Sequence, residues 1–206
     1  MTDDNGRLLR SAALAEGEGE AEASDAATRL LARASAEGLL DVAYAGVDSP
    51  FGRLLVAATP RGLVRIDYLL DGSETEALER LAARISPRLL EAPGEVDHVR
   101  RELDEYFAGQ RRDFDLALDW RLTAGFSRRV LRATARVGYG HTSTYAELAR
   151  RAGSSRAHRA AGNALHHNPL PIVVPCHRVL RTGGGLGGYA GGLPVKERLL
   201  RLEGAL

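Results

Sequence analysis

The chain has 206 residues, of which 44% are hydrophobic, and a formal net charge of +1, which is typical of a globular protein that buries a core. No apolar run is long enough to span a membrane, and the acidic start MTDDNG is unlike a secretory signal peptide. The single cysteine excludes an internal disulfide and a zinc cage of several thiolates. We therefore expect a cytoplasmic protein of one large or two small domains, with a reduced thiol.

Charge is divided unevenly along the chain. Residues 1–50 carry a net charge of −6 and residues 51–120 a net charge of −4, whereas residues 121–181 carry +10, with eleven arginines and one acid. Arginine forks match phosphate oxygens, so this basic part predicts a polyanion partner, most simply nucleic acid. A compositional bias explains why the chain has 27 arginines and one lysine, but it does not explain the scarcity of acids here.

The N-terminal part predicts a tail followed by a small sheet. Residues 1–37 are rich in Ala, Glu, Gly and Asp without a hydrophobic period, which indicates a disordered acidic tail. From residue 38, short β-branched and apolar runs are separated by DSPFG and TPRG. We predict antiparallel strands near 53–58 and 62–68, joined by a tight turn at Pro60 and Gly62.

Two helices and a connector complete a predicted N-terminal domain, residues 38–118. One helix carries the apolar stripe Ala77, Leu78, Leu81 and Ile85, and the next carries Val96, Val99, Leu103, Tyr106 and Phe107 before Gly109 ends it. The alternating RRDFDLALDW predicts a strand or an extended connector. The fold class is therefore α/β: a small N-terminal α/β domain with an antiparallel sheet, then a mostly helical C-terminal domain, residues 119–206.

The C-terminal domain begins with a helix over FSRRVLRATARV, whose predicted buried side chains are Phe126, Val130, Leu131 and Val137. A capping box follows, because Thr144 precedes Glu147 by three residues, and it starts a short helix that ends at Gly153.

A second helix is predicted from a cap at Ser154 or Ser155 to about His167, where Asn168 and Pro169 end it. Two short helices joined by a glycine-containing turn form a helix-turn-helix, whose second helix can enter a DNA groove. Arg156, Arg159 and Asn163 fall on one face of this helix and are candidate DNA contacts.

The segment PIVVPCHRVL contains the only cysteine, Cys176. A thiol is mostly protonated at neutral pH, so it needs a base or a positive field to become a nucleophile. His177, Arg178 and the basic preceding helix should favour the thiolate. Adjacent residues of an extended chain point opposite ways, so we expect His177 to act through a water or after a local turn, with Glu203 as a candidate partner. The alternative is an inert, buried cysteine.

The sequences NPLPIVVPCHRV and GGYAGGLPVKERLL closely resemble the O6-alkylguanine-DNA alkyltransferases over residues 121–206. The resemblance implies that the protein flips O6-alkylguanine, chiefly O6-methylguanine, out of duplex DNA. It further implies that the alkyl group moves irreversibly and stoichiometrically to the protein's own Cys176. No cofactor, metal, membrane or obligate protein partner is expected, and the partner is double-stranded DNA containing the lesion.

The resemblance also assigns roles to residues. Cys176 matches the acceptor, His177 the group that takes its proton through a water, Glu203 the residue that orients His177, and Asn168 the residue that holds the active-site turn. Arg159 matches an arginine that fills the gap left by the flipped base. The other predicted site residues contact DNA or line the substrate pocket: Tyr145, Arg156, Asn163 and Arg178 for DNA, and Tyr145, Tyr189, Ala190, Val179 and Leu165 for the pocket.

Two positions depart from the family pattern. Ala190 stands where many relatives have serine, and His158 stands where a small residue is usual. Two other functions stay open on the sequence. One is a catalytically silent protein that binds DNA and marks lesions, although such proteins lack the acceptor cysteine. The other is a cysteine hydrolase that uses Cys176, His177 and Glu203.

Overall fold

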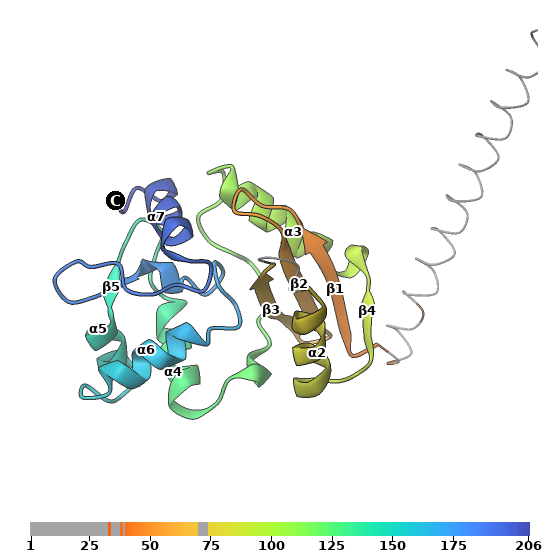
Figure 1. Cartoon of the computed structure of the whole chain (residues 1–206), viewed down its shortest axis with the longest axis horizontal. Coiled ribbons are helices and arrows are strands. Elements are labelled where there is room, and N and C mark those ends of the chain that lie inside the picture. Colours follow the sequence, from red (N-terminus) through yellow and green to blue (C-terminus); the bar gives the residue numbers. More distant parts are fainter. Residues whose placement is uncertain (1–32, 34–37, 39, 70–73) are drawn as a thin grey trace, which may run out of the picture. The chain divides into compact units, whose positions relative to one another are not determined.

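The computed structural model describes residues 33, 38, 40–69 and 74–206 (Figure 1). The chain divides into two units, Met1–Leu40 and Asp41–Leu206. Apart from Arg33, the predicted acidic tail, residues 1–37, lies outside the described residues, so it stays a prediction. The fold and the site described below belong to the second unit.

A four-stranded sheet forms the N-terminal half of this unit, in the order β3-β2-β1-β4 (Figure 1). The strand β2 (Leu54–Thr59) pairs antiparallel with β1 (Val42–Val47) on one side and β3 (Gly62–Tyr68) on the other, and the β2–β3 pair was predicted. The short β4 (Leu89–Glu91) pairs in parallel with β1, which was not predicted. Three residues give too weak an alternation to identify a strand from sequence.

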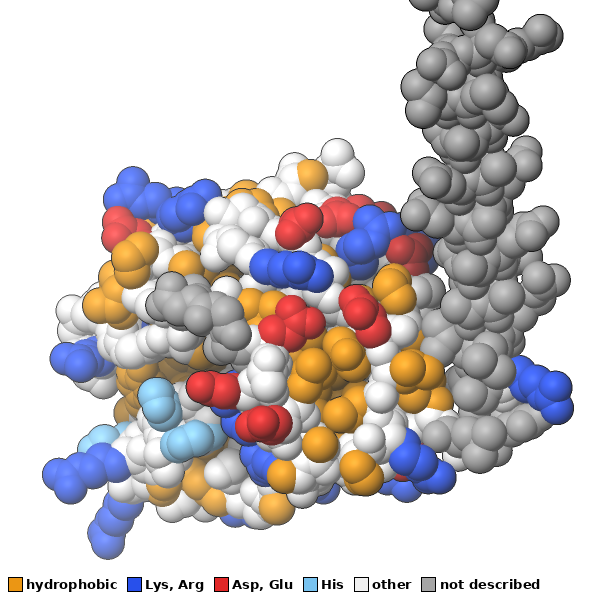
Figure 2. Space-filling model, turned by 45° about the vertical axis from the view of Figure 1, so that its right-hand side comes forward, with side chains coloured by type: hydrophobic (Ala, Val, Ile, Leu, Met, Phe, Trp, Pro, Cys, Tyr) orange, Lys and Arg blue, Asp and Glu red, His pale blue; other side chains and the backbone are white. Residues whose placement is uncertain are grey.

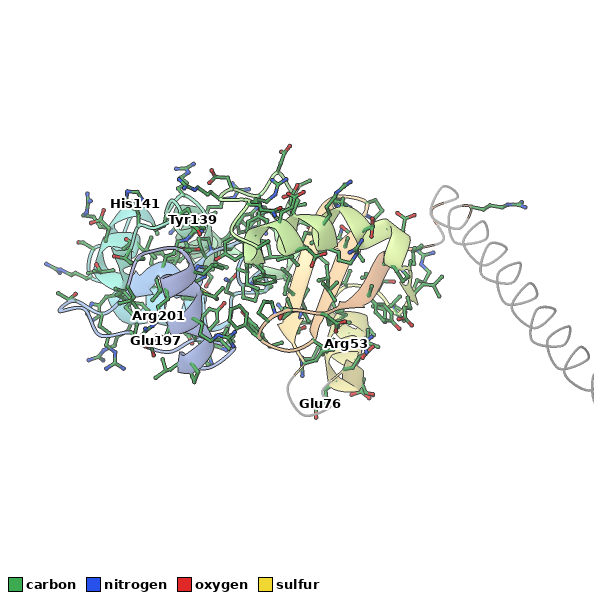
Figure 3. The ribbon with its side chains drawn as sticks, turned by 90° about the horizontal axis from the view of Figure 1, so that it is seen from above. Arg53, Glu76, Tyr139, His141, Glu197 and Arg201 are labelled. Atoms are coloured by element: carbon green, nitrogen blue, oxygen red, sulfur yellow. The ribbon has the colours of Figure 1, made fainter. Side chains whose placement is uncertain are left out.

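Helices cover both faces of this sheet. Every residue of β2 is buried, because its side chains alternate between two apolar clusters. One cluster includes side chains of α2 (Glu74–Arg84), and the other includes side chains of α3 (Pro93–Phe107). Figure 3 shows α3 lying along the sheet. The predicted apolar stripes of both helices are confirmed at Ala77, Leu81, Val96, Val99 and Leu103, which are all buried.

An extended connector follows α3, as the alternating sequence indicated. Its Leu118 pairs with Leu63 of β3, and the Leu63 amide donates to the Ala117 carbonyl at 2.8 Å. Gly62 has a φ of +121°, and a side chain there would strike the Ala117 carbonyl. Glycine is therefore required by both the tight turn and the close approach of the connector. The 3-10 helix η1 (Trp120–Leu122) ends this connector.

The C-terminal half is mostly helical, so the predicted fold class is confirmed. It contains α4 (Gly125–Thr134), α5 (Tyr145–Arg151), α6 (His158–His166) and α7 (Leu193–Leu202). Val130 and Leu131 of α4 are buried as predicted, but the helix ends at Thr134, and Val137 is buried beyond its end. A single apolar cluster continues from the sheet through α4, α5, α6 and α7.

The helix-turn-helix is α5 and α6, and its start is confirmed while its second cap is wrong. The Thr144 hydroxyl accepts from the Glu147 amide at 3.2 Å, and Gly153 takes a φ of +87° after α5. However, α6 begins at His158 after Ala157, with no side-chain cap. Arg156 therefore lies in the preceding turn, where the backbone bond from Ala157 to Ser154 replaces a serine cap.

A two-stranded parallel sheet connects this motif to the segment after the cysteine. In it, β5 (Ser143–Thr144) pairs with β6 (Val179–Leu180). This pairing holds the start of α5, and with it Tyr145, beside the segment that follows Cys176. In the part of the chain that the structure describes, no helix is both long and apolar enough to cross a membrane.

Candidate active site

The segment between α6 and Cys176 is a compact turn fastened by Asn168. The Asn168 amide nitrogen donates to the Val174 carbonyl at 2.8 Å, and its oxygen accepts from the Leu170 amide at 3.1 Å. The same nitrogen lies 3.2 Å from the Cys176 sulfur. Asn168 is buried, so one side chain both closes the turn and donates toward the thiol.

Two γ-turns bend the backbone within this segment. The Val173 amide donates to the Pro171 carbonyl at 2.9 Å around Ile172, and the Cys176 amide donates to the Val174 carbonyl at 2.8 Å around Pro175. Ile172 is fully buried with a φ of +72°, a conformation that costs a β-branched residue about 1–3 kcal/mol. The surrounding hydrophobic core holds this strained turn, which presents Cys176 at the start of the 3-10 helix η2 (Cys176–Arg178).

The thiol of Cys176 is protonated at rest. Burial raises its pKa to about 11, although the hydrogen bond from Asn168 and the charge of Lys196 act in the opposite direction. Burial thus outweighs the positive charge near the thiol, which the sequence led us to expect would favour the thiolate. Arg178, which the sequence analysis counted among the basic neighbours of the thiol, donates its hydrogen bonds to Glu203.

His177 is a neutral imidazole with one nitrogen available. Its Nε2 lies 2.9 Å from Glu203 Oε1, so that nitrogen carries the proton and Nδ1 is the acceptor. Burial lowers the His177 pKa, although the Glu203 carboxylate raises it. Within the described ranges, Nδ1 has no hydrogen-bond partner and is fully buried. Cys176 and His177 lie in the 3-10 turn η2, so they are not part of an extended chain whose adjacent side chains point opposite ways.

Glu203, at the end of α7, accepts hydrogen bonds from three side chains. Besides His177, Arg178 Nε and NH2 lie 2.9 and 2.8 Å from its two oxygens, and the Tyr106 hydroxyl donates at 2.6 Å. Burial opposes ionisation of Glu203, but the bonds from His177, Arg178 and Tyr106 outweigh it and lower its pKa to about 2. The carboxylate is thus fixed in orientation and charge.

The position of Arg178 corrects its predicted role. Its side chain is buried, pairs with Glu203 and donates to the Val137 carbonyl, so it holds the Glu203 carboxylate inside the protein and is not a surface contact. Val179 is also corrected. It is fully buried in β6 and does not line the cavity that contains Cys176.

Two residues of this region were not identified as functional from the sequence. Tyr106 was read as part of a core stripe, although a buried phenol needs a hydrogen-bond partner, and that requirement was the available signal. Lys196 is the only lysine in the chain. It is fully buried, donates to the carbonyls of Val179 and Leu186, and has a pKa that burial lowers to about 8.

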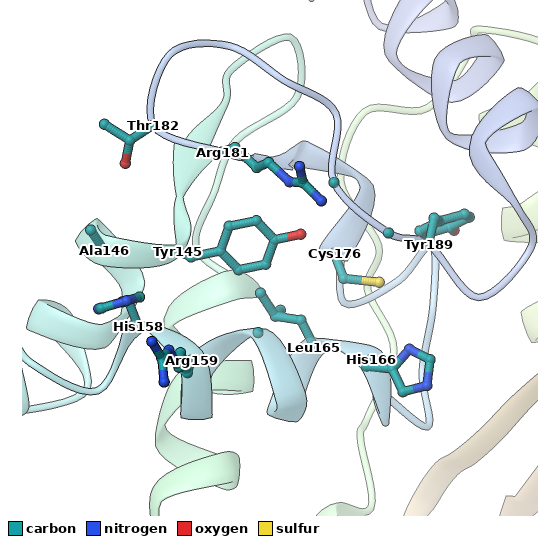
Figure 4. A pocket seen from close by; sticks show the side chains of 13 residues that line it. Tyr145, Ala146, His158, Arg159, Leu165, His166, Cys176, Arg181, Thr182 and Tyr189 are labelled. Atoms are coloured by element: carbon teal, nitrogen blue, oxygen red, sulfur yellow. The ribbon is translucent and has the colours of Figure 1, made fainter.

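A cavity of about 690 Å³ opens above the thiol (Figure 4). Figure 4 shows Cys176 between Tyr145 on one side and Tyr189 on the other. The predicted pocket residues Tyr145, Tyr189 and Leu165 line it, together with Arg159 of α6. Glycine at position 187 allows the loop to approach Tyr145, because a β-carbon there would collide with the Tyr145 hydroxyl.

Ala190 does not line this cavity. It borders a second cavity of about 300 Å³, whose lining also includes Tyr68, His166 and Asn168. The prediction that Ala190 lines the substrate pocket is therefore wrong for this arrangement of the loop between Arg181 and Gly192.

The predicted DNA contacts lie at the cavity rim and beyond it. Arg159 and His158 line the cavity, and both are exposed. Asn163 is exposed on α6, and Arg156 is exposed in the turn before it. Figure 2 shows basic side chains projecting beside histidines at one end of the molecule. In the described part of the chain, no group of three or more His, Cys, Asp or Glu side chains could hold a metal ion.

Comparisons with known proteins identify both halves of the chain. Residues 42–120 match the ribonuclease-like domain of 6-O-methylguanine DNA methyltransferase, and residues 125–205 match its DNA-binding domain. A methylated-DNA–protein-cysteine methyltransferase of Mycolicibacterium paratuberculosis is 41% identical over 162 residues, 79% of this chain and 92% of that protein. One of Methanosarcina acetivorans is 37% identical over 79% of this chain and 98% of that protein.

The chain belongs to the methylated-DNA–protein-cysteine methyltransferase family. The structure agrees, since Mycobacterium tuberculosis OGT in complex with DNA superposes with a TM-score of 0.69 at 37% identity, over 79% of this chain and 93% of that one. The chain is accordingly a DNA repair methyltransferase with a DNA-binding domain. The relatives named above support alkyl transfer and not the silent, lesion-marking alternative.

Proposed function

We propose that this methyltransferase removes the alkyl group from O6 of guanine in duplex DNA and keeps it on Cys176. The observation that supports this best is a lone thiol at a cavity that two tyrosines also line, next in the chain to an imidazole whose acceptor nitrogen is set by Glu203. A cavity of about 690 Å³ is within the range of small-molecule sites.

The transfer is a displacement at the alkyl carbon. The sulfur of Cys176 forms the new S–C bond while the C–O6 bond breaks and its electron pair stays on the guanine oxygen. The thiol proton passes through a water to Nδ1 of His177, and the departing guanine takes up a proton. No tetrahedral intermediate forms, so no acyl-type oxyanion hole is needed. The thioether product is stable, which makes the reaction stoichiometric and irreversible.

A base is needed because the thiol is neutral at rest. With a pKa of about 11, Cys176 supplies almost no thiolate at pH 7 without help. The Nε2 bond to Glu203 keeps the His177 acceptor on Nδ1 and stabilises the imidazolium that forms when the proton arrives. Asn168 lies within hydrogen-bond distance of the sulfur and stabilises the developing negative charge.

The target guanine must leave the base stack to reach this cavity, at a cost of a few kcal/mol. In our proposal, α6 approaches the duplex and Arg159 fills the space left by the base. Tyr145 and Tyr189 enclose the guanine, and Leu165 contributes apolar surface. The support is that these four residues line one cavity with Cys176. Arg156 and Asn163 are proposed to contact the DNA backbone beyond the cavity.

We further propose that the protein acts in the cytoplasm, requires no cofactor, metal or obligate protein partner, and binds no membrane. Residues 38–118 and 119–206 serve as two domains of one body, and the acidic residues 1–37 reduce nonspecific DNA binding by competing for the basic face.

The deciding experiment is intact-protein mass spectrometry after mixing with one equivalent of a duplex that contains one O6-methylguanine, followed by peptide mapping. We expect a gain of one methyl group, confined to Cys176, and no second turnover when more duplex is added. Cys176→Ala should bind the duplex with unchanged affinity and gain no mass. Methylation of another residue, or repeated turnover, would refute the proposal.

A further inference from the structure

The far wall of the active-site cavity is held from the N-terminal sheet. Tyr68 is the last residue of β3, and its hydroxyl lies 2.9 Å from the hydroxyl of Tyr189. The two rings meet edge to face, with centroids 5.9 Å apart. On the same side, a β-carbon at Gly191 would lie 3.0 Å from the Tyr68 ring. Tyr68 thus packs against the loop segment that carries Tyr189.

The backbone of β3 fixes where Tyr68 stands relative to the thiol. Two residues before it, the Ile66 amide donates to the Pro169 carbonyl at 2.8 Å. Pro169 directly follows Asn168, whose side chain binds Cys176. The strand is therefore fastened to the active-site turn itself, and Tyr68 transmits that fixed position to Tyr189.

Tyr68 and Tyr189, whose hydroxyls meet, border different cavities. Tyr189 lines the cavity with Cys176, and Tyr68 and Ala190 line the second cavity, of about 300 Å³. His166 borders both cavities, so they adjoin. Residues 181–185 and 188 of the loop that leads to Tyr189 are exposed, so the contact with Tyr68 is what ties the Tyr189 side chain to the sheet.

We infer that Tyr68 is a positioning residue that limits the alkyl groups accepted by Cys176, because its hydroxyl bond holds Tyr189 as the fixed end of the pocket. The inference rests on the proposed alkyl transfer. Both side chains are half-buried, and each is the only hydroxyl partner that the described residues offer the other. A buried hydroxyl left without its partner is penalised, so the pair stays closed in the native protein.

Tyr68→Phe tests the inference because it removes one oxygen and leaves the ring. Single-turnover transfer is measured from matched duplexes that contain O6-methylguanine or O6-benzylguanine. We expect the benzyl-to-methyl rate ratio to rise about fivefold, as the loss of one hydrogen bond frees Tyr189. Tyr189→Phe breaks the same bond and should raise the ratio similarly, and the double variant should add little. Tyr44→Phe, on β1 and outside both cavities, is the matched control and should leave the ratio unchanged.

The outcomes separate the inference from the proposed function. A wild-type protein that does not methylate Cys176 refutes the proposed function. If the wild type transfers normally, three results overturn the inference alone: an unchanged ratio in Tyr68→Phe, an equal fall of both rates, or multiplicative effects of the two substitutions. Should Tyr68→Phe fail to fold, Tyr189→Phe alone decides, since it removes the same hydrogen bond.

Discussion

The active site has two regions that are held in opposite ways. In the buried relay, which consists of His177, Glu203, Arg178 and Tyr106, the side chains hydrogen-bond to one another within 2.6–2.9 Å. The exposed rim consists of Arg156, His158, Arg159 and Asn163, whose side chains have no hydrogen-bond or ion-pair partner among the described residues. The relay is complete within the protein, whereas the rim is proposed to obtain its partners from DNA.

This difference predicts how substitutions in each region behave. The relay belongs to the folded protein's own interior, so changing it affects stability and the chemical step even when DNA binding is intact. The rim contributes little to the free energy of unfolding, because exposed charges are solvated. Changing it affects affinity, salt dependence and base extrusion.

The largest expected effect comes from removing the base of the relay. His177→Gln should slow methyl transfer about 10²–10⁴-fold, because no side chain then takes the thiol proton. The variant's rate should rise about tenfold per pH unit between pH 7 and 9, since solvent must generate a thiolate whose pKa is about 11. The wild-type rate should stay level there and fall only in acid, because burial lowers the His177 pKa. If the variant and the wild type had parallel pH profiles in single-turnover assays, His177 would not be the base that takes the thiol proton.

The next largest effect concerns Glu203 and stability. Glu203→Gln leaves the buried Arg178 charge without its counter-ion and should cost about 3 kcal/mol of unfolding free energy at pH 7. The carboxylate's folded pKa of about 2 lies below its ordinary value, so it stabilises the protein above pH 4.5 and loses this contribution as the pH falls toward 2. Denaturant unfolding should therefore show the wild-type advantage shrinking from pH 5 to pH 2.

The same helix offers a matched control for that prediction. Glu197 pairs with Arg201 at 2.6 Å on the exposed side of α7 (Figure 3). Glu197→Gln should cost less than about 0.5 kcal/mol, since solvent screens the pair. An advantage of Glu203 that is constant over pH, or a cost equal to that of Glu197→Gln, would show that the relay is not fixed by charge.

The division between relay and rim also explains what the sequence could predict. The Thr144 cap, the tight turn at Gly62 and the apolar stripes depend on residues close in the chain, and all three were predicted correctly. Partners far apart in the chain were not. Tyr106 lies 97 residues from Glu203, and Tyr68 lies 121 residues from Tyr189.

Arg178 shows the physical reason for such an error. A local pattern gives the charge of a side chain but not its depth, and arginine suits a buried ion pair as well as a phosphate. Only the packing of α7 against η2 brings Glu203 to Arg178. The second helix of the helix-turn-helix begins at His158, after the two serines that the sequence offered as caps, and no side chain caps it.

The rim should respond to substitution through DNA alone. Arg159→Ala should lower the transfer rate on saturating duplex about tenfold or more, because base extrusion costs a few kcal/mol and this side chain is proposed to offset it. Arg156→Ala should weaken duplex affinity about threefold and reduce the salt slope by about one, as expected for a phosphate contact. Both variants should react with free O6-benzylguanine at the wild-type rate. A comparable loss with the free base would place Arg159 in the chemical step.

The smallest expected effect is at Ala190, where the family resemblance and the structure differ. The family resemblance leads one to expect serine there, but this alanine borders the second cavity, with Tyr68 and Asn168, and not the cavity that contains Cys176. Ala190→Ser should therefore change the methyl-transfer rate less than about twofold, since a new hydroxyl that contacts neither the substrate nor the thiol does not alter the barrier. A rise above fivefold in single-turnover assays would mean that DNA binding turns the loop so that residue 190 meets the guanine. The loop would then belong with the rim, which DNA organises, and not with the relay.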